Sequence, residues 1–466
     1  MTDALVQALR GALGDRGVLE NPEDRARFET GWRYGKGTAR CIARPDSTAL
    51  VAETLRLCAR HGARVVAQGA NSGLVASSTP DASGAMVVLS LERLNRTIDV
   101  DAEGRTVVVD GGVLLSQLNE ALLPHGFWFP VDLGADPQIG AMVATNTGGT
   151  RLLKYGDVRH NLLGVEVVLG DGRVLSLLNK LRKNNTGFDA KQAFVATTGV
   201  FGIVTRAVLQ VAPVPRQRAT ALVACSGGAP VLELLRALEA ELGDVLSAFE
   251  VMSANALGPV FTHQPNLRRP FAQLPPYSVL VELSSTLPAD ALHLENVLEA
   301  CLGAFLERAG DAVPDVLVGK GDEFWQMRHH ISESLRGEGR MLAFDVSVPR
   351  SRLPAFTADV LQLLAEKHSR VRLCDYGHWG DGGTHLNLLW QEKDVADGRA
   401  LVVALQEAIY DLAVNGYQGS YSAEHGVGPH NQRFYDRYTD PLVRSLCRVL
   451  GDFCDPGDLL GTVRLE

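Results

Sequence analysis

The chain has 466 residues, of which 46% are hydrophobic and 21% charged, and its formal net charge is -9 at pH 7. This composition predicts an ordinary globular chain of about three domains, or two large ones. No block of lysine and arginine is interleaved with aromatic residues, which argues against nucleic acid as the main partner. No apolar run approaches the roughly 20 residues of a membrane span, and the first residues lack the pattern of a secretion signal.

The seven cysteines are scattered, without a Cys-x-x-Cys pair. We expect them to be buried small apolar residues in a reducing compartment. Their spacing also argues against an iron–sulfur cluster ligated by cysteines of this chain. A cytoplasmic location is therefore expected, with peripheral association at the inner membrane as a further possibility.

The first half alternates short strands and helices around three glycine-rich segments, residues 69–74, 137–149 and 199–204. A helix is predicted within residues 45–62, and hairpins are predicted at 97–109 and 163–177. Small residues let a backbone approach a ligand, and successive N–H groups can bind an anion. Residues 69–74 match neither a P-loop nor a Rossmann fingerprint, and a surface turn is an alternative for them. Three such segments together favour a long ligand between two halves of a domain.

Residues 213–215, Pro-Val-Pro, mark a boundary. Beyond it, the pattern predicts an α+β domain with an antiparallel sheet. The predicted strands are 220–225, 278–283 and 344–349, and the predicted helices are 229–242, 289–308, 322–336, 352–368, 397–414 and 440–453. Within helix 322–336, Arg328 and Ser332 are four residues apart and would share a face.

An Asp-Gly pair, Asp381-Gly382, predicts a hairpin turn between two β-type runs. With these as the two turn residues, His378 would lie directly opposite His385. Asn387 would share the face of His385, because side chains alternate along a strand. Two imidazoles and a carboxamide would then converge on one patch.

A carboxylate and a third imidazole follow in a glycine-rich stretch, at Glu424 and His425. Two histidines and a carboxylate with open positions are typical of a catalytic metal site, whereas a structural metal site is closed. The alternative is a hairpin whose histidines only pack or form hydrogen bonds. From these residues alone, neither interpretation is preferred.

Residues 45–213 resemble the FAD-binding domain of the vanillyl-alcohol oxidase and p-cresol methylhydroxylase flavoproteins. In that family the glycine-rich loop ending in Gly-Leu holds the FAD pyrophosphate, and the other two segments resemble its second and third FAD-contacting loops. The resemblance implies FAD contacts from Gly69, Ala70, Asn71, Ser72, Gly73, Leu74, Pro137, Gly140, Asn146, Gly148, Gly149, Gly199, Gly202, Ile203 and Val204. Ala70 and Asn71 stand where glycines are common, although asparagine tolerates a positive φ better than most residues. The first loop has no histidine, which implies non-covalent FAD.

The second half resembles the C-terminal domain of the FAD-linked D-2-hydroxyacid dehydrogenases, which include D-lactate and D-2-hydroxyglutarate dehydrogenases and the glycolate oxidase flavin subunit. Four features carry this resemblance, and they lie at residues 325–328, 344–349, 377–387 and 424–426. The implied fold is α+β, with a two-part FAD-binding domain and an α+β substrate domain that has an antiparallel sheet. The implied domains are FAD-binding (1–215), substrate and metal-binding (216–425), and a C-terminal helical segment (426–466) that packs back on the FAD domain.

The resemblance implies three ligands for a divalent metal, zinc or manganese: His378, His385 and Glu424. His425 would take the hydroxyl proton of the substrate as general base, while the Cα hydride passes to the flavin N5. Arg328 would bind a substrate carboxylate, assisted by Asn387 and Ser332. Alternatively, Arg328 is a solvated surface charge, His425 supports the ligands, and Asn387 only satisfies a strand.

Ala343 stands where family members that take dicarboxylates often have a lysine. Unless Arg336 or Arg340 substitutes, D-lactate or a bulkier apolar D-2-hydroxy acid is as credible a substrate as D-2-hydroxyglutarate. The resemblance implies a quinone or an electron-transfer flavoprotein as electron acceptor, and a homodimer is possible. The alternatives are a flavin oxidase that uses O₂, a non-catalytic flavoprotein subunit of a larger complex, and a metal hydrolase without flavin.

Overall fold

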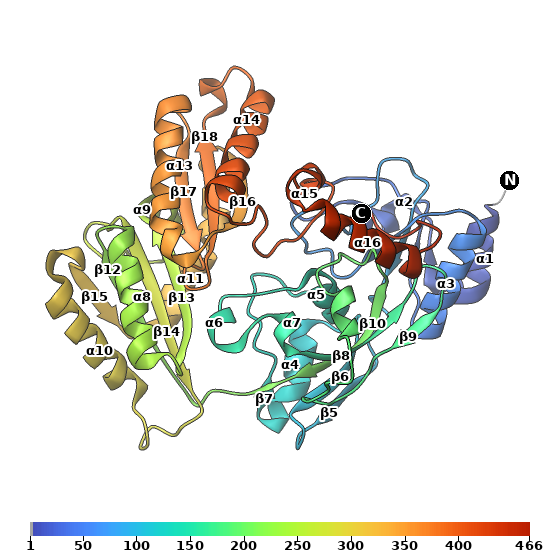
Figure 1. Ribbon diagram of the computed structural model, residues 1–466, viewed down its shortest axis with the longest axis horizontal. Helices are drawn as coiled ribbons and strands as arrows, with labels where there is room; N and C mark the ends of the chain where they lie inside the picture. The colour runs from blue at the N-terminus through green and yellow to red at the C-terminus, as the bar shows by residue number, and fades with distance from the viewer. Residues whose placement is uncertain (1–2) are drawn as a thin grey trace. The chain divides into compact units, whose positions relative to one another are not determined.

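The computed structural model describes residues 3–466, which divide into two compact units (Figure 1). The first, called the N-terminal unit, comprises the chain up to Gly148 together with Gly156–Val214 and Glu424–Glu466. The second, called the central unit, comprises Gly149–Tyr155 and Pro215–Ala423. Each unit therefore contains segments that are far apart in the sequence.

The N-terminal unit has two main sheets. Its helices are α1 (Ala4–Leu13), α2 (Pro22–Glu29), α3 (Thr48–Arg60), α4 (Leu115–Leu122), α5 (Ile139–Thr145), α7 (Val158–Asn161), α15 (Gln432–Tyr438) and α16 (Pro441–Cys454). Its strands are β1 (Val18–Leu19), β2 (Cys41–Ala43), β3 (Val65–Gln68), β4 (Val87–Ser90), β5 (Ile98–Asp101), β6 (Thr106–Asp110), β7 (Phe127–Trp128), β8 (Leu162–Val168), β9 (Val174–Ser176), β10 (Ile203–Gln210) and β11 (Ala212–Pro213). One sheet has the order β1-β2-β4-β3 and the other the order β5-β6-β10-β8-β9. The two predicted hairpins are confirmed as β5–β6 and β8–β9.

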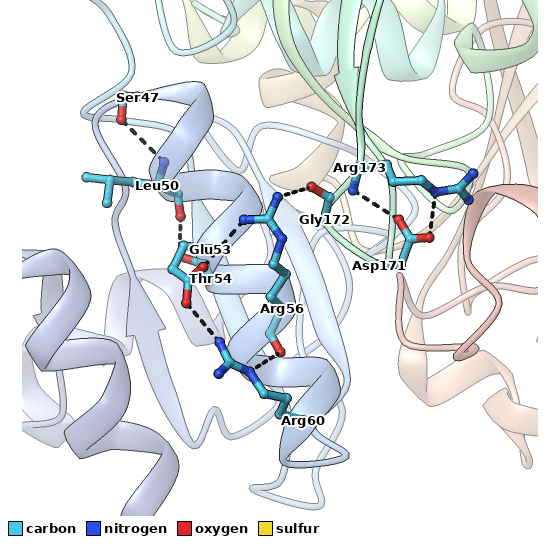
Figure 2. A network of polar contacts seen from close by, with 9 residues as sticks. All are labelled: Ser47, Leu50, Glu53, Thr54, Arg56, Arg60, Asp171, Gly172 and Arg173. Atoms are coloured by element: carbon cyan, nitrogen blue, oxygen red, sulfur yellow. Dashed lines mark hydrogen bonds and ion pairs between the residues drawn. The ribbon is translucent and has the colours of Figure 1, made fainter.

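Helix α3 shows how local sequence positions one element in this unit (Figure 2). The Ser47 side chain accepts a hydrogen bond from the Leu50 N–H at 3.3 Å, which satisfies one of the unpaired N–H groups at the helix start. Arg56 Nη2 donates to the Gly172 carbonyl at 2.7 Å, so the helix is tied to the β8–β9 turn. Gly172 has φ 82°, and a Cβ there would lie 2.6 Å from Arg56 Cγ. Glycine therefore suits this turn both conformationally and sterically.

The C-terminal residues add to the first sheet of the N-terminal unit. The N–H of Val65, at the start of β3, donates to the Leu459 carbonyl at 2.8 Å, and the Val65 carbonyl accepts from the Gly461 N–H at 2.7 Å. Gly428 also packs tightly on the backbone of Val75. The last residues of the chain are thus held beside residues near position 65 by backbone hydrogen bonds.

The central unit is built on one antiparallel sheet with the order β15-β12-β14-β13-β17-β18-β16. Its strands are β12 (Gln217–Cys225), β13 (Leu246–Ser253), β14 (Tyr277–Ser285), β15 (Asp315–Val318), β16 (Arg340–Ser347), β17 (Arg372–Gly377) and β18 (Gly383–Trp390). Its helices are α6 (Leu152–Tyr155), α8 (Gly228–Leu242), α9 (Ala254–His263), α10 (Leu294–Ala309), α11 (Gly321–His329), α12 (Ile331–Arg336), α13 (Leu353–Lys367) and α14 (Gly398–Asp411). The predicted α+β class with an antiparallel sheet is confirmed.

Two expectations for the central unit are wrong. The predicted helix 322–336 is two helices, α11 and α12, which meet at His330. Arg328 and Ser332 consequently lie on different helices and do not share one helical face. The sequence pattern also missed β13 and α9, although all eight residues of β13 are buried. A strand buried on both faces lacks the alternation that reveals a half-exposed strand.

The expected burial is confirmed for six of the seven cysteines, which are also unbridged, while Cys447 is half-buried. Burial raises the pKa of the Cys58 thiol to about 12, so it remains protonated at neutral pH. Among the helices of residues 3–466, none is long and apolar enough to cross a membrane.

Candidate active site

Four side chains with metal-ligating atoms gather at one place, and they are Asp345, His385, Glu424 and His425. One ligand atom from each lies within 4.8 Å of those from the others. Strands β16 and β18 bring the first two together, because Asp345 and His385 are directly opposed in the antiparallel ladder. The backbone fixes the third, since the N–H of Ala423, the residue before Glu424, donates to the Asp345 carbonyl at 3.2 Å.

This donor set fits a divalent metal ion. His385 Nδ1 lies 3.7 Å from Asp345 Oδ1, and His425 Nε2 lies 3.7 Å from Glu424 Oε1. Imidazole and carboxylate ligands suit zinc, manganese and iron, and a set that leaves coordination positions open is typical of a catalytic site. Asp345 is an addition that the sequence did not predict, although its motif at residues 344–349 was singled out.

His378 lies just beyond β17 and outside that group of four. Its Nδ1 is 2.5 Å from Glu250 Oε1, and its ring centroid is 5.3 Å from that of His385. Glu250 also accepts a hydrogen bond from Arg328 Nε at 2.6 Å. Burial alone would raise the pKa of Glu250, but His378 and Arg328 hold this pKa at about 2. An imidazole oriented by a carboxylate is typical of metal-ligating histidines.

The predicted register of the hairpin is wrong by two residues. Tyr376, not His378, is paired with His385, and β17 ends at Gly377. Residues 378–382 form a loop that is closed by two hydrogen bonds to the His378 carbonyl, from Asp381 N–H at 3.0 Å and Gly383 N–H at 3.2 Å. The loop is longer than the two-residue turn that an Asp-Gly pair favours. The two histidine rings still approach each other across it.

Arg328 is not a surface residue, because only 9% of it is exposed. Besides its ion pair with Glu250, its guanidinium lies 4.6 Å from the ring centroid of Tyr376. Asn387 is also buried, and its Nδ2 donates to the Cys374 carbonyl at 3.4 Å. The alternative that Arg328 is a solvated surface charge is therefore wrong. The alternative that Asn387 only satisfies a strand agrees with its bond to the neighbouring strand.

One face of the central sheet carries these groups. Asp345, His385 and Tyr376 are in register across β16, β18 and β17. Tyr376 is paired in turn with Met252 of β13. Glu250 lies two residues before Met252 on this strand and therefore shares its face. The sequence reasoning missed Glu250 because it missed β13. One signal in the sequence could have revealed Glu250, because it is the single carboxylate in the largely apolar run 246–253. A charged side chain is rarely buried without a partner.

In the N-terminal unit, the three glycine-rich segments approach one another. A Cβ at Gly69 would lie 2.8 Å from Ala141 Cβ, and a Cβ at Gly140 would lie 2.8 Å from the Val204 carbonyl oxygen. Asn71 adopts φ 56°, the positive value that asparagine tolerates. Backbones that approach so closely at glycines fit an extended cofactor such as FAD.

The second of these segments is not a simple loop. Ile139–Thr145 forms helix α5, which ends where Asn146 takes a left-handed conformation with φ 49°. The Asn146 side chain is engaged with Asp157 Oδ2 at 2.8 Å and with the Arg159 N–H. These two bonds fix the orientation of the Asn146 side chain.

Comparison with known proteins now adds to this geometry. A family model described as FAD binding domain matches residues 39–178, and one described as FAD linked oxidases, C-terminal domain matches residues 214–463. The mitochondrial D-2-hydroxyglutarate dehydrogenase of Bos taurus is 34% identical over 457 residues, which is 96% of this chain and 81% of that protein. The corresponding protein of Arabidopsis thaliana is 31% identical, over 99% of this chain and 81% of that protein.

The chain belongs to the FAD-linked D-2-hydroxyacid dehydrogenases. A D-2-hydroxyglutarate–pyruvate transhydrogenase of Saccharomyces cerevisiae is also 31% identical, over 97% of this chain and 92% of that protein. Among solved structures, substrate-bound p-cresol methylhydroxylase gives a TM-score of 0.73 at 16% identity, covering 98% of this chain and 95% of that one. The predicted flavoprotein fold, the enzyme class and FAD as cofactor are confirmed.

Proposed function

We propose that this dehydrogenase oxidises a D-2-hydroxy acid to the 2-oxo acid, using non-covalent FAD and a divalent metal held by His378, His385 and Glu424. The observation that carries the proposal is the gathering of Asp345, His385, Glu424 and His425 within 4.8 Å in a chain of this family. His378 is included because its ring centroid lies 5.3 Å from that of His385. Bound FAD supplies a two-electron acceptor, and bound zinc or manganese supplies positive charge beside the substrate oxygens.

The protein's own residues manage the proton and the orientation of the substrate. His425 accepts the hydroxyl proton as general base while the C=O bond forms and the hydride leaves Cα. Glu250 orients the His378 ring through its contact with Nδ1, and Asp345 adds a carboxylate 3.7 Å from His385 Nδ1. Asn387 and Ser332 are proposed to assist in binding the substrate, as the resemblance implies, and Asn387 lies two residues from the proposed ligand His385.

Arg328 is proposed to bind the substrate carboxylate. Its guanidinium is held by Glu250 and by the Tyr376 ring, so its planar fork is fixed in direction before a substrate binds. D-2-hydroxyglutarate is one candidate because relatives are named for it. Ala343 opposes Asn387 in the ladder and supplies no cation for a second carboxylate, so D-lactate and apolar D-2-hydroxy acids are equal candidates.

For the remaining partners the proposal follows the resemblance. The electron acceptor is proposed to be a quinone or an electron-transfer flavoprotein, and a homodimer is the proposed assembly. A cytoplasmic location, with peripheral association at the inner membrane, remains a prediction, and several relatives are named mitochondrial.

Anaerobic titration of the purified protein with a panel of D- and L-2-hydroxy acids tests the proposal. A D-acid should bleach the flavin absorbance, a chelator should abolish the bleaching, and zinc or manganese should restore it. Bleaching that ignores the chelator would refute the metal role and leave the flavin chemistry intact. Failure with every acid would refute the proposed reaction for the isolated chain. Peroxide formation in air without a dye would favour an oxidase.

A further inference from the structure

A short segment that follows the glycine-rich stretch 137–149 belongs to the central unit although its neighbours on both sides belong to the N-terminal unit. This segment is Gly149–Tyr155, and it contains helix α6. Its side chains reach buried positions of the central sheet. Nothing in the roles assigned above uses it.

Arg151 makes a two-point ion pair with Glu282 of β14. Arg151 Nε lies 2.8 Å from Glu282 Oε1 and Arg151 Nη2 lies 3.0 Å from Oε2. The exposed fractions are 7% for Arg151 and 2% for Glu282. Ser247 Oγ donates to Oε1 at 2.8 Å and Trp325 Nε1 donates to Oε2 at 2.9 Å. Both carboxylate oxygens are thus saturated with donors, as a buried charge requires.

The same contacts reach the helix that carries Arg328. Trp325 and Arg328 are three residues apart on α11 and therefore neighbours on its surface. Trp325 is fixed by its bond to Glu282 and by the Arg151 guanidinium, which lies 5.1 Å from its ring centroid. Arg328 in turn holds Glu250, the partner of His378. The contacts of Arg151 with Glu282 and Trp325 therefore fix the orientation of α11.

A second contact of the segment reaches the loop that carries His378. A Cβ placed on Gly380 would lie 2.6 Å from Leu153 Cδ1, so the Leu153 side chain packs directly against this loop residue. Gly380 is two residues from His378. One short segment therefore supports both proposed site elements, the α11 arginine and the 378–382 loop.

We propose that Arg151, together with Leu153, is a positioning residue for the oxidation reaction. Arg151 holds α11 through Glu282 and Trp325, and Leu153 holds the 378–382 loop, so that Arg328 and His378 keep their productive geometry. This inference rests on the proposed function, because it assumes the roles of these two residues. Apolar residues of similar size often give a fold as much stability as a buried ion pair does, so stability alone does not account for this pair. The planar guanidinium fixes the direction of its hydrogen bonds, which apolar side chains do not.

The test uses the holoenzyme with Arg151→Met/Glu282→Gln, which leaves neither charge buried. The amide oxygen of the glutamine can accept from Trp325 Nε1 while its NH₂ group donates to Ser247 Oγ. Thermal stability and FAD content should stay near wild type, while kcat/KM for the D-2-hydroxy acid falls about 10- to 100-fold. The single variant Arg151→Lys keeps the positive charge but not the planar fork, so its kcat/KM should lie between those of the double variant and the wild type. The matched control is Tyr155→Phe, which removes a hydroxyl contact to Ser284 Oγ on the same strand as Glu282 and should leave kcat/KM unchanged.

Hydrogen exchange gives a readout that does not depend on turnover. In the double variant, amides of α11 and of residues 378–382 should exchange about tenfold faster than in wild type, while β12 and β14 stay protected. Inactive wild-type enzyme would refute the proposed function, and exchange would still test the positioning role. Unchanged exchange at both sites, or a folded double variant with kcat/KM within about twofold of wild type, would overturn the inference.

Discussion

Glu282→Gln offers a sharp test of the buried network in the central unit. The carboxylate accepts four hydrogen bonds, two of them from Arg151. A glutamine amide presents one oxygen and one NH₂ group. Since the two Arg151 donors approach different oxygens, either amide orientation sets the NH₂ group against an Arg151 N–H.

The magnitude follows from that mismatch. At least one charge-assisted hydrogen bond is lost, worth about 1.5–3 kcal/mol. The Arg151 charge also stays buried without its counter-ion, and removing one partner of a buried pair costs about 3–5 kcal/mol in total. The free energy of unfolding at pH 7 should therefore fall by about 3–5 kcal/mol in this variant. Adding Arg151→Met should recover most of this loss, because the unpaired charge disappears.

The pH dependence supplies an independent check. Burial alone would raise the pKa of Glu282, but hydrogen bonding from Arg151 holds this pKa below its ordinary value of 4.5. A carboxylate with a lowered pKa in the folded state contributes stability that is present above the unfolded pKa and is lost as the pH falls below it. The difference between wild type and Glu282→Gln should therefore be constant above pH 4.5 and shrink below it.

Urea denaturation of the FAD-loaded chain, followed by circular dichroism at several pH values, measures both effects. The matched control is Glu392→Gln, because Glu392 pairs with Arg340 at 2.8 Å with both side chains more than half exposed. A surface pair of this kind contributes little to stability, because water and salt screen both charges. A loss in Glu282→Gln no larger than in this control, or a difference that does not shrink in acid, would refute the account of the network.

Three further predictions concern the proposed site. His378→Ala should abolish turnover while the yellow FAD remains bound, and loss of FAD in this variant would show that the site is misplaced. Gly69→Val should lower FAD affinity, because its Cβ would lie 2.8 Å from Ala141 Cβ, whereas Gly11→Ala, where nothing lies within 4 Å, should not; equilibrium dialysis compares them. Arg328→Lys should raise KM for the acid at least about tenfold, because an ammonium lacks the planar fork, and an unchanged KM would argue against carboxylate binding.

The parts of the fold that the sequence predicted depend on neighbours in the chain. The helix within residues 45–62 and the turns of the β5–β6 and β8–β9 hairpins were predicted from local signals, and the structure has all three. The break between α11 and α12 at His330 has no glycine or proline to announce it. Tertiary packing decides such a boundary, and one chain's pattern does not contain that information.

The candidate site divides in the same way. His385 and Asn387 were predicted to share a face because both lie on one strand, and β18 has them at matching positions. Glu250 and Asp345 join the site only through the order β13-β17-β18-β16, which pairs strands far apart in the sequence. The predicted pairing of His378 with His385 is wrong because β17 ends before His378, and the loop that follows is longer than the Asp-Gly pair.

Charge balance on this face explains why a divalent cation is expected to matter for binding as well as for chemistry. Glu250 offsets the charge of Arg328, so this arginine contributes direction to a substrate carboxylate but little net charge. Asp345 and Glu424 place two negative charges beside the histidines. A 2-hydroxy acid anion entering there without a metal would meet like charge, which is costly at short range in a partly buried site. Chelation should therefore weaken binding of the acid itself, seen as loss of the flavin spectral shift produced by a non-reducing 2-oxo acid product. A shift of undiminished affinity after metal removal would contradict this electrostatic argument.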